Sequence, residues 1–149
     1  MIPTITPAPI TVLLDTNIAM DIITKREGYE DSLMVLKYCE LGQVKGILSA
    51  LTVADLMYIL RKHIPPSQVS ETVQTLLLVA DMADILKSDM MYAFSSGMKD
   101  FEDAVQAACS KRIKADYIIT KNIKDFKGSD VPALLPKDFL KMLRGGAGD

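Results

Sequence analysis

Short apolar runs of strand length alternate with longer helical patterns along this chain of 149 residues. The expected strands cover residues 10–14, 46–49, 83–87, 115–120 and 132–135. The first run, ITVLL, is continuous and contains β-branched residues, which is typical of a strand buried on both faces. Because strands and helices alternate, the pattern predicts βαβ units and a parallel sheet covered on both faces. We therefore expect a three-layer α/β/α sandwich.

The chain has the ordinary size of one domain, without repeats or an internal linker. The expected helices cover residues 16–24, 30–41, 52–62, 66–81, 89–95, 100–113 and 136–143. We expect one domain over residues 9–143, between flexible tails at residues 1–8 and 144–149.

Composition excludes several classes of protein. Hydrophobic residues make up 49% and charged residues 24%, which is too apolar for a disordered chain. No apolar run approaches the ~18 residues of a membrane-spanning helix, so we expect no membrane association. The N-terminus lacks the features of a secretory signal, and two cysteines are too few for a disulfide framework. These observations favour a cytoplasmic protein.

The formal net charge is −2, whereas a protein that binds nucleic acid through its overall charge is strongly basic. Any contact with nucleic acid therefore requires a local basic patch, or a metal ion that screens phosphate from acidic groups.

Acidic residues occur where strands end, which is where ligands bind in an open parallel sheet. Asp15 directly follows the first expected strand, and Asp125 lies in the loop after the fourth. Each acid also has a structural interpretation. Asp15 fits a helix N-cap, and Thr52 with Asp55 resembles a capping box.

Asp100 likewise fits the N-cap of the helix that contains Asp103. If the strands that precede Asp15 and Asp125 are neighbours, their carboxylates meet at one sheet edge, and helix starts can bring Asp55 and Asp103 there. Such a cluster repels itself, and a hard divalent cation relieves the repulsion. Metal-dependent phosphodiester hydrolysis is the chemistry that this arrangement favours.

Three segments carry a resemblance to a known family: LLDTNIAMD, ILSALTVADLMYILRK and KDFEDAVQAACSKRIKADYIITKNIKDF. The sequence resembles the PIN-domain ribonucleases over about residues 10–143, because the three segments occur in the order and at the spacing of that family. It is similar above all to the toxin components of type II toxin–antitoxin modules. DFEDA followed by ADYIITKNIKDF is the most specific part of the match.

The resemblance implies about five parallel strands and a metal-dependent endoribonuclease that uses Mg²⁺ or Mn²⁺. It makes four acids catalytic: Asp15, Asp55, Asp103 and Asp125. Three of these acids, Asp15, Asp103 and Asp125, are the implied metal ligands. Asp55 falls at the family's mid-chain acidic position, which is usually Glu.

Further residues are implied in supporting roles. Thr16, Asn17 and Asn122 accompany the acids. Apart from the resemblance, Lys121 and Lys124 lie in the loop after the fourth expected strand and are candidate contacts for RNA phosphates. The implied partners are RNA, a cognate antitoxin and a second copy of the chain. The apolar run at residues 76–79 (LLLV) offers a surface for such a dimer, unless it belongs to the core.

Other parallel-sheet proteins with acids at strand ends fit less well. A response-regulator receiver needs an acidic pair after the first strand, and a haloacid-dehalogenase-type phosphatase needs a second Asp at position 17. A non-catalytic PIN-like binding domain remains as the alternative. Metal-dependent cleavage that disappears when Asp15 is mutated would separate it from the nuclease.

Overall fold

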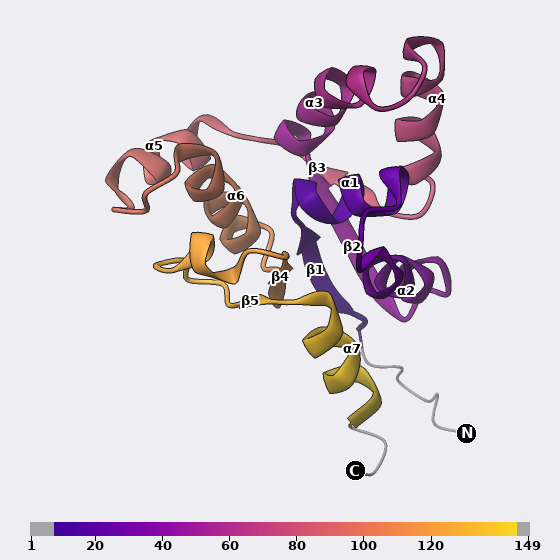
Figure 1. Cartoon of the computed structure of the whole chain (residues 1–149). Helices are drawn as coiled ribbons and strands as arrows, with labels where there is room; N and C mark the ends of the chain where they lie inside the picture. Colours follow the sequence, from indigo (N-terminus) through magenta and orange to yellow (C-terminus); the bar gives the residue numbers. More distant parts are fainter. Residues whose placement is uncertain (1–7, 146–149) are drawn as a thin grey trace, which may run out of the picture.

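The computed structural model of the protein describes residues 8–145, in which five strands form one parallel sheet (Figure 1). The strands are β1 (Ile10–Leu14), β2 (Val44–Ser49), β3 (Asp81–Ala83), β4 (Tyr117–Ile119) and β5 (Ala133–Leu134). Their order across the sheet is β3-β2-β1-β4-β5, and every neighbouring pair is parallel. The expected α/β/α architecture with about five parallel strands is confirmed.

Seven α-helices and two short 3₁₀ helices lie between or after the strands of the described part. The α-helices are α1 (Thr16–Thr24), α2 (Tyr29–Glu40), α3 (Ala50–Ile59), α4 (Pro66–Leu76), α5 (Lys87–Ser95), α6 (Phe101–Arg112) and α7 (Pro136–Gly145). The 3₁₀ helices are η1 (Leu60–Lys62) and η2 (Ile123–Phe126). No helix in residues 8–145 is long and apolar enough to cross a membrane.

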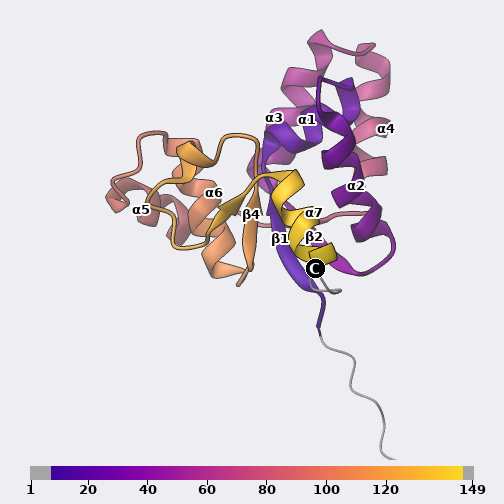
Figure 2. The same ribbon diagram turned by 60° about the horizontal axis from the view of Figure 1, so that its bottom comes forward.

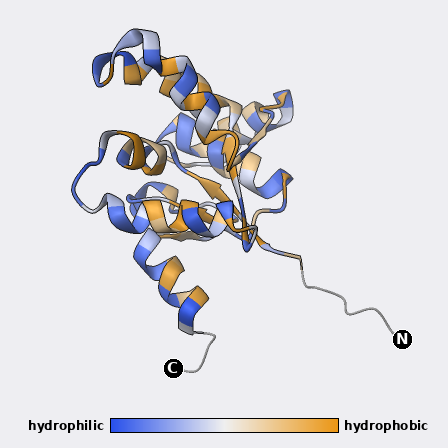
Figure 3. Ribbon diagram, turned by 90° about the vertical axis from the view of Figure 1, so that its right-hand side faces the viewer, coloured by the Kyte–Doolittle hydropathy of each residue, from blue (hydrophilic) through white to orange (hydrophobic). Residues whose placement is uncertain are grey.

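The helices cover the two faces of the sheet unequally. One face packs against buried residues of α1, α2, α3, α4 and α7, and the other packs against α6. Helix α5 packs on α6, so these two helices form a separate lobe beside the sheet (Figures 1 and 2). In Figure 3 the central strands are largely hydrophobic, whereas the helices alternate between hydrophobic and hydrophilic residues.

Strand β1 lies at the centre of the sheet because both of its faces are apolar. Val12 and Leu14 contact the larger core cluster, whereas Leu13 between them contacts the smaller one on the opposite face. Successive side chains of a strand point to opposite faces, so a continuous apolar run suits this position.

The third strand lies at Asp81–Ala83, so the predicted strand at residues 83–87 is wrong. Its partner β2 ends at Ser49, which pairs with Ala83, and the chain then turns into α3. After Ala83, backbone hydrogen bonds go to side chains instead of to a neighbouring strand. The Asp84 carbonyl accepts hydrogen bonds from the side chains of Cys109 and Arg112.

Helix α4 ends at Leu76, five residues before the predicted end of this helix. The apolar run at residues 76–79 is mostly core, since Leu76 is buried and its neighbours Leu77 and Val79 pack against the core. Only Leu78 of this run is exposed, at 85%. The run therefore offers little surface for a dimer.

The predicted tails lie almost entirely outside the described residues. Residue 8 has no regular structure, and residues 1–7 and 146–149 are not described. At the other end, α7 continues through residues 144 and 145, which were assigned to the tail.

The connections of the sheet reverse direction between β1 and β4. The chain passes from β1 outward through β2 to β3, then crosses the sheet to β4 and β5 on the other side of β1. A crevice forms outside the carboxyl ends of the strands at such a reversal, where α/β proteins bind ligands. Asp15 follows the last residue of β1 at this point.

Candidate active site

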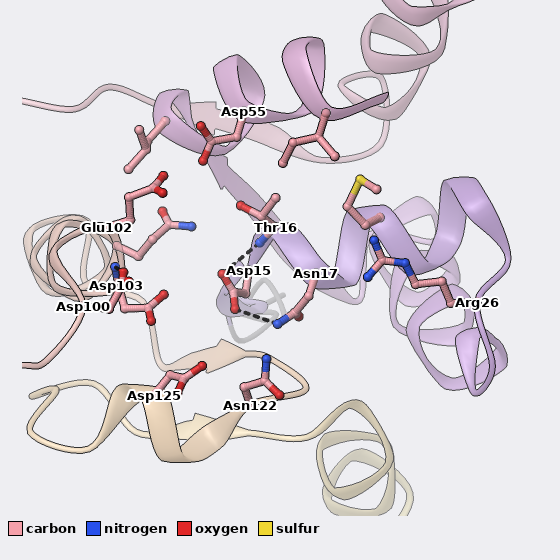
Figure 4. A pocket seen from close by; sticks show the side chains of 14 residues that line it. Asp15, Thr16, Asn17, Arg26, Asp55, Asp100, Glu102, Asp103, Asn122 and Asp125 are labelled. Carbon is pink, nitrogen blue, oxygen red and sulfur yellow. Dashed lines mark hydrogen bonds between the residues drawn. The ribbon is translucent and has the colours of Figure 1, made fainter. Parts of the chain in front are cut away.

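A pocket of about 340 Å³ lies at the carboxyl ends of β1 and β4 (Figure 4). Six carboxylates line it: Asp15, Asp55, Asp100, Glu102, Asp103 and Asp125. The other lining residues are Thr16, Asn17, Met20, Arg26, Leu51, Ile59, Gln106 and Asn122. The four acids and three supporting residues predicted from the sequence therefore all face one cavity.

Asp15 is held at the base of the pocket by hydrogen bonds to both of its oxygens. Its Oδ1 accepts from the Thr16 N–H at 2.9 Å, and its Oδ2 accepts from Thr120 Oγ1 at 2.8 Å and from Asn17 Nδ2 at 3.0 Å. The residue is only 8% exposed and is the N-cap of α1. The two interpretations of Asp15 are compatible, because a capping carboxylate can also line a ligand pocket.

The alternative interpretation of Thr52 and Asp55 as a capping box is wrong. Ser49 is the N-cap of α3, and its Oγ accepts from the Thr52 N–H at 3.1 Å. Thr52 is buried and its hydroxyl bonds to Thr16 Oγ1 at 2.9 Å and to Gln106 Nε2 at 2.7 Å. Asp55 is therefore free of a capping role, and it lines the pocket from the second turn of α3.

Asp100 and Asp103 at the start of α6 both line the pocket, but only Asp100 also caps the helix. Asp100 is the N-cap, and its Oδ1 accepts from the Asp103 N–H at 3.0 Å. The side chain of Asp103 is half-buried and faces the pocket from the first turn (Figure 4). Asp103 therefore retains its carboxylate for a ligand.

Burial, hydrogen bonding and the crowding of the acids raise several pKa values in the pocket. Burial, followed by repulsion from Asp15 and Asp100, raises the pKa of Asp103 to about 7. A hydrogen bond with Asp55, then burial and nearby negative charge, raises the pKa of Glu102 to about 7. Burial also raises the pKa of Asp15, although its hydrogen bonds oppose that shift. The pocket is therefore poised to take up positive charge.

The loop after β4 completes the pocket. Thr120 Oγ1 accepts the Asn122 N–H at 3.0 Å, and Asn17 Oδ1 accepts the Lys121 N–H at 3.2 Å. These bonds join the loop to the start of α1. Asn122 and Asp125 consequently lie beneath the acids of α3 and α6 in Figure 4.

Lys121 does not line the acidic pocket. Its Nζ lies 2.9 Å from Asp21 Oδ2 and donates to the Glu27 carbonyl at 3.2 Å. Asp21 is fully buried, so this ion pair anchors the loop against α1. A contact between Lys121 and RNA would require breaking that pair, whereas Lys124 has no ion-pair partner within residues 8–145.

Two residues that matter to the pocket were not identified from the sequence: Gln106 and Thr120. Gln106 lies three residues after Asp103 in a buried stretch of α6, and this spacing places both on one helix face. Glu102 lies four residues before Gln106, so it is on the same face of α6. The sequence places Thr120 at the end of the fourth expected strand, and this position is the only sequence signal of its bond to Asp15.

The donor set of the pocket fits a hard divalent cation, since it consists of carboxylate and amide oxygens without a histidine or cysteine. Within residues 8–145, no three His, Cys, Asp or Glu side chains are close enough to hold one ion together. Mg²⁺ commonly binds through one or two carboxylates and keeps several waters. Direct contact from two acids, with others acting through water, suits the observed spacing.

The fold and the pocket define an α/β protein with an acidic ligand site at the switch point of a parallel sheet. The sequence matches the family model of the PIN domain over residues 11–124. This match covers more than half of the chain, so the protein belongs to the PIN domain family. No curated protein sequence matches the chain closely enough to count as a relative.

Several solved structures share this fold. VapBC2 from Rickettsia felis, bound to a DNA fragment from its promoter, matches with a TM-score of 0.66 at 20% identity, over 85% of this chain and 98% of that chain. VapBC-1 from nontypeable Haemophilus influenzae matches with a TM-score of 0.68 at 18% identity, over 86% and 99%. A toxin–antitoxin complex from Klebsiella pneumoniae matches with a TM-score of 0.66 at 22% identity, over 84% and 97%.

Proposed function

We propose that this protein is a metal-dependent endoribonuclease that hydrolyses phosphodiester bonds of RNA in the cytoplasm. The observation that carries the proposal is the convergence of six carboxylates on one pocket at the switch point of the sheet. Nuclease activity is characteristic of the PIN domain family. The family resemblance assigned catalysis to four of these acids: Asp15, Asp55, Asp103 and Asp125.

In this proposal, Asp15 and Asp103 hold Mg²⁺ or Mn²⁺ directly, and Asp125 and Asp55 complete the site, directly or through water. The bound cation would polarise a phosphoryl oxygen and activate the attacking water. Asn17 fixes the orientation of Asp15 through its 3.0 Å hydrogen bond. Thr16 and Asn122 support the two loops that carry Asp15 and Asp125.

Within residues 8–145, Arg26 is the only cationic side chain that lines the pocket, and it forms no ion pair with any other residue of this part. It enters from the side opposite to Asp100, Glu102 and Asp103 (Figure 4). A guanidinium in this place can bind an RNA phosphate that the surrounding acids repel.

The test is RNA cleavage mapping in cells after induced expression of the wild type and of Asp103→Asn. We expect new RNA ends with the wild type and none with the variant, which loses a charge but no observed side-chain hydrogen bond. Identical profiles would contradict the nuclease and favour a non-catalytic binding domain. With purified protein, chelator-sensitive cleavage that survives both Asp15→Asn and Asp103→Asn would identify a contaminating nuclease.

We further propose that the protein is the toxin of a toxin–antitoxin module and forms a homodimer. The fold shared with the Klebsiella pneumoniae toxin–antitoxin complex and with the VapBC structures supports the toxin assignment. The homodimer rests on the family resemblance alone. The reading frame beside its gene should encode a small protein that co-purifies with this chain and suppresses its cleavage of RNA. Co-expression without complex formation or suppression would contradict the toxin assignment.

A further inference from the structure

A second, larger cavity of about 690 Å³ adjoins the acidic pocket. The two cavities share Asp100 and Asp125, so a ligand in one can continue into the other. Three lysines line the second cavity: Lys99, Lys124 and Lys127. We call it the lysine groove.

The lysines of the groove are available to an anionic ligand. All three residues are exposed, and within residues 8–145 none of them pairs with a carboxylate. Three positive charges face two shared carboxylates in a chain whose formal net charge is −2. The groove is therefore a local basic patch of the kind that an acidic protein needs for binding phosphate.

One side of the groove is apolar. Met98 packs against both smaller core clusters, and Gly128 lies so close that a Cβ there would be 3.5 Å from Met98 Cγ. Gly97 and Gly128 have φ values of 75° and 96°, which favour glycine at both bends. An apolar wall beside ammonium groups suits a nucleotide, whose base is flat and whose phosphate is anionic.

We propose that the lysine groove binds a nucleotide next to the scissile phosphate of single-stranded RNA. This inference rests on the proposed nuclease function. The base packs on Met98 and the phosphate lies among Lys99, Lys124 and Lys127. The strand then passes over the acids towards Arg26, which lies on the other side of the acidic pocket (Figure 4). A groove of this volume lies within the usual range for small ligands.

The test measures RNA affinity by fluorescence anisotropy with a labelled, unstructured 12-nucleotide RNA in Mg²⁺. All proteins carry Asp103→Asn so that the RNA stays intact. One variant adds Lys99→Gln and Lys127→Gln in the groove. The matched control adds Lys45→Gln and Lys141→Gln, two exposed lysines that do not line either cavity and give the same change in charge.

We expect the groove variant to bind about tenfold more weakly, and its affinity to depend less steeply on salt, with the log–log slope smaller by about 1. The control should bind within about twofold of the parent protein. Equal losses in both variants, or no loss in the groove variant, would overturn the proposal. Circular dichroism and melting temperature establish that each variant is folded.

The two proposals fail in different ways. If cleavage depends on Asp103, but the groove substitutions leave RNA affinity unchanged in the Asp103→Asn protein and kcat/KM unchanged in the active protein, the groove proposal is wrong and the nuclease proposal is retained. If the wild type neither binds nor cleaves RNA, both fall. Cross-linking of 4-thiouridine RNA to Met98 or its neighbours in the parent protein would support the groove directly.

Discussion

Thr120 shows how one buried hydroxyl supports the candidate site. The side chain is fully buried, donates to Asp15 and accepts the Asn122 N–H, so it joins both loops of the pocket. Thr120→Val removes these bonds and leaves buried polar groups unpaired, which should cost about 1–3 kcal/mol of unfolding free energy. Cleavage should also fall by about 10- to 100-fold, as for other residues that orient metal ligands.

Thr120→Ser is the control, because it keeps the hydroxyl and should retain most stability and cleavage. Urea denaturation and the RNA cleavage rate measure the two effects. If the valine variant were as active as the serine variant, Thr120 would have no role in positioning Asp15.

The pKa of Asp103 predicts how stability depends on pH in protein kept free of divalent cations by EDTA. The pKa is about 7 in the folded protein, against an ordinary value of 3.8. Between these values the folded state binds more protons than the unfolded state, so stability should fall as pH rises from 5 to 8. In Asp103→Asn this contribution is absent.

We therefore expect the melting temperature of the wild type to fall more steeply than that of Asp103→Asn over this pH range. Glu102, whose pKa is also about 7, adds a smaller effect in the same direction because it is more exposed. If the melting temperatures of the two proteins changed equally with pH, the pKa of Asp103 would not be raised.

At the scale of elements, α5 and α6 are joined by a pair of opposite charges. Arg112 at the end of α6 donates from Nε and Nη2 to the carboxylate of Asp89 in the first turn of α5, at 3.0–3.1 Å. The Asp89 side chain is 3% exposed, and that of Arg112 is 30% exposed. The ion pair therefore links α5 to α6 within the lobe.

Arg112→Met should destabilise the protein by about 3 kcal/mol, because the buried carboxylate loses its partner. Asp89→Asn in the same protein should recover part of the loss. A double-mutant cycle in urea measures the coupling, and additive effects of the two substitutions would contradict it.

Most elements, but not all of their boundaries, could be predicted from the sequence. The run ITVLL and the helix caps are local signals, so β1 and the start of α6 appear where expected. The limits of β3 depend on its partner, because β2 turns into α3 directly after Ser49. No local pattern within residues 83–87 carries that information.

At the scale of the whole molecule, the meeting of the acids depends on which strands are neighbours. The sequence indicates that Asp15 and Asp125 follow strands, but their proximity requires β1 and β4 to pair, as the structure shows. Glu102 and Gln106 could not be assigned in advance, since their relevance depends on the face that α6 turns towards the sheet. The predicted carboxylate set nevertheless lines one pocket.

The molecule also exposes apolar side chains, which we propose as an interface between copies. Phe94 of α5 and Phe101 of α6 are 73% and 40% exposed, with ring centroids 4.9 Å apart. We expect the purified chain to be a dimer of about 33 kDa by light scattering, twice its mass of 16.4 kDa. Phe94→Ser should shift it towards the monomer if this lobe forms the interface. A wild-type monomer at high concentration would contradict the dimer.

The central claim is that the clustered carboxylates make this protein a metal-dependent nuclease. The most direct measurement is the cleavage rate of a defined unstructured RNA by purified wild type, Asp103→Asn and the surface control Asp138→Asn, each with Mn²⁺ and with EDTA. We expect cleavage by the wild type and the control in Mn²⁺, none in EDTA, and at least a 100-fold loss in Asp103→Asn, by analogy with the loss of a charge-stabilising group. Equal cleavage by wild type and Asp103→Asn, or cleavage that is unchanged by EDTA, would contradict the account.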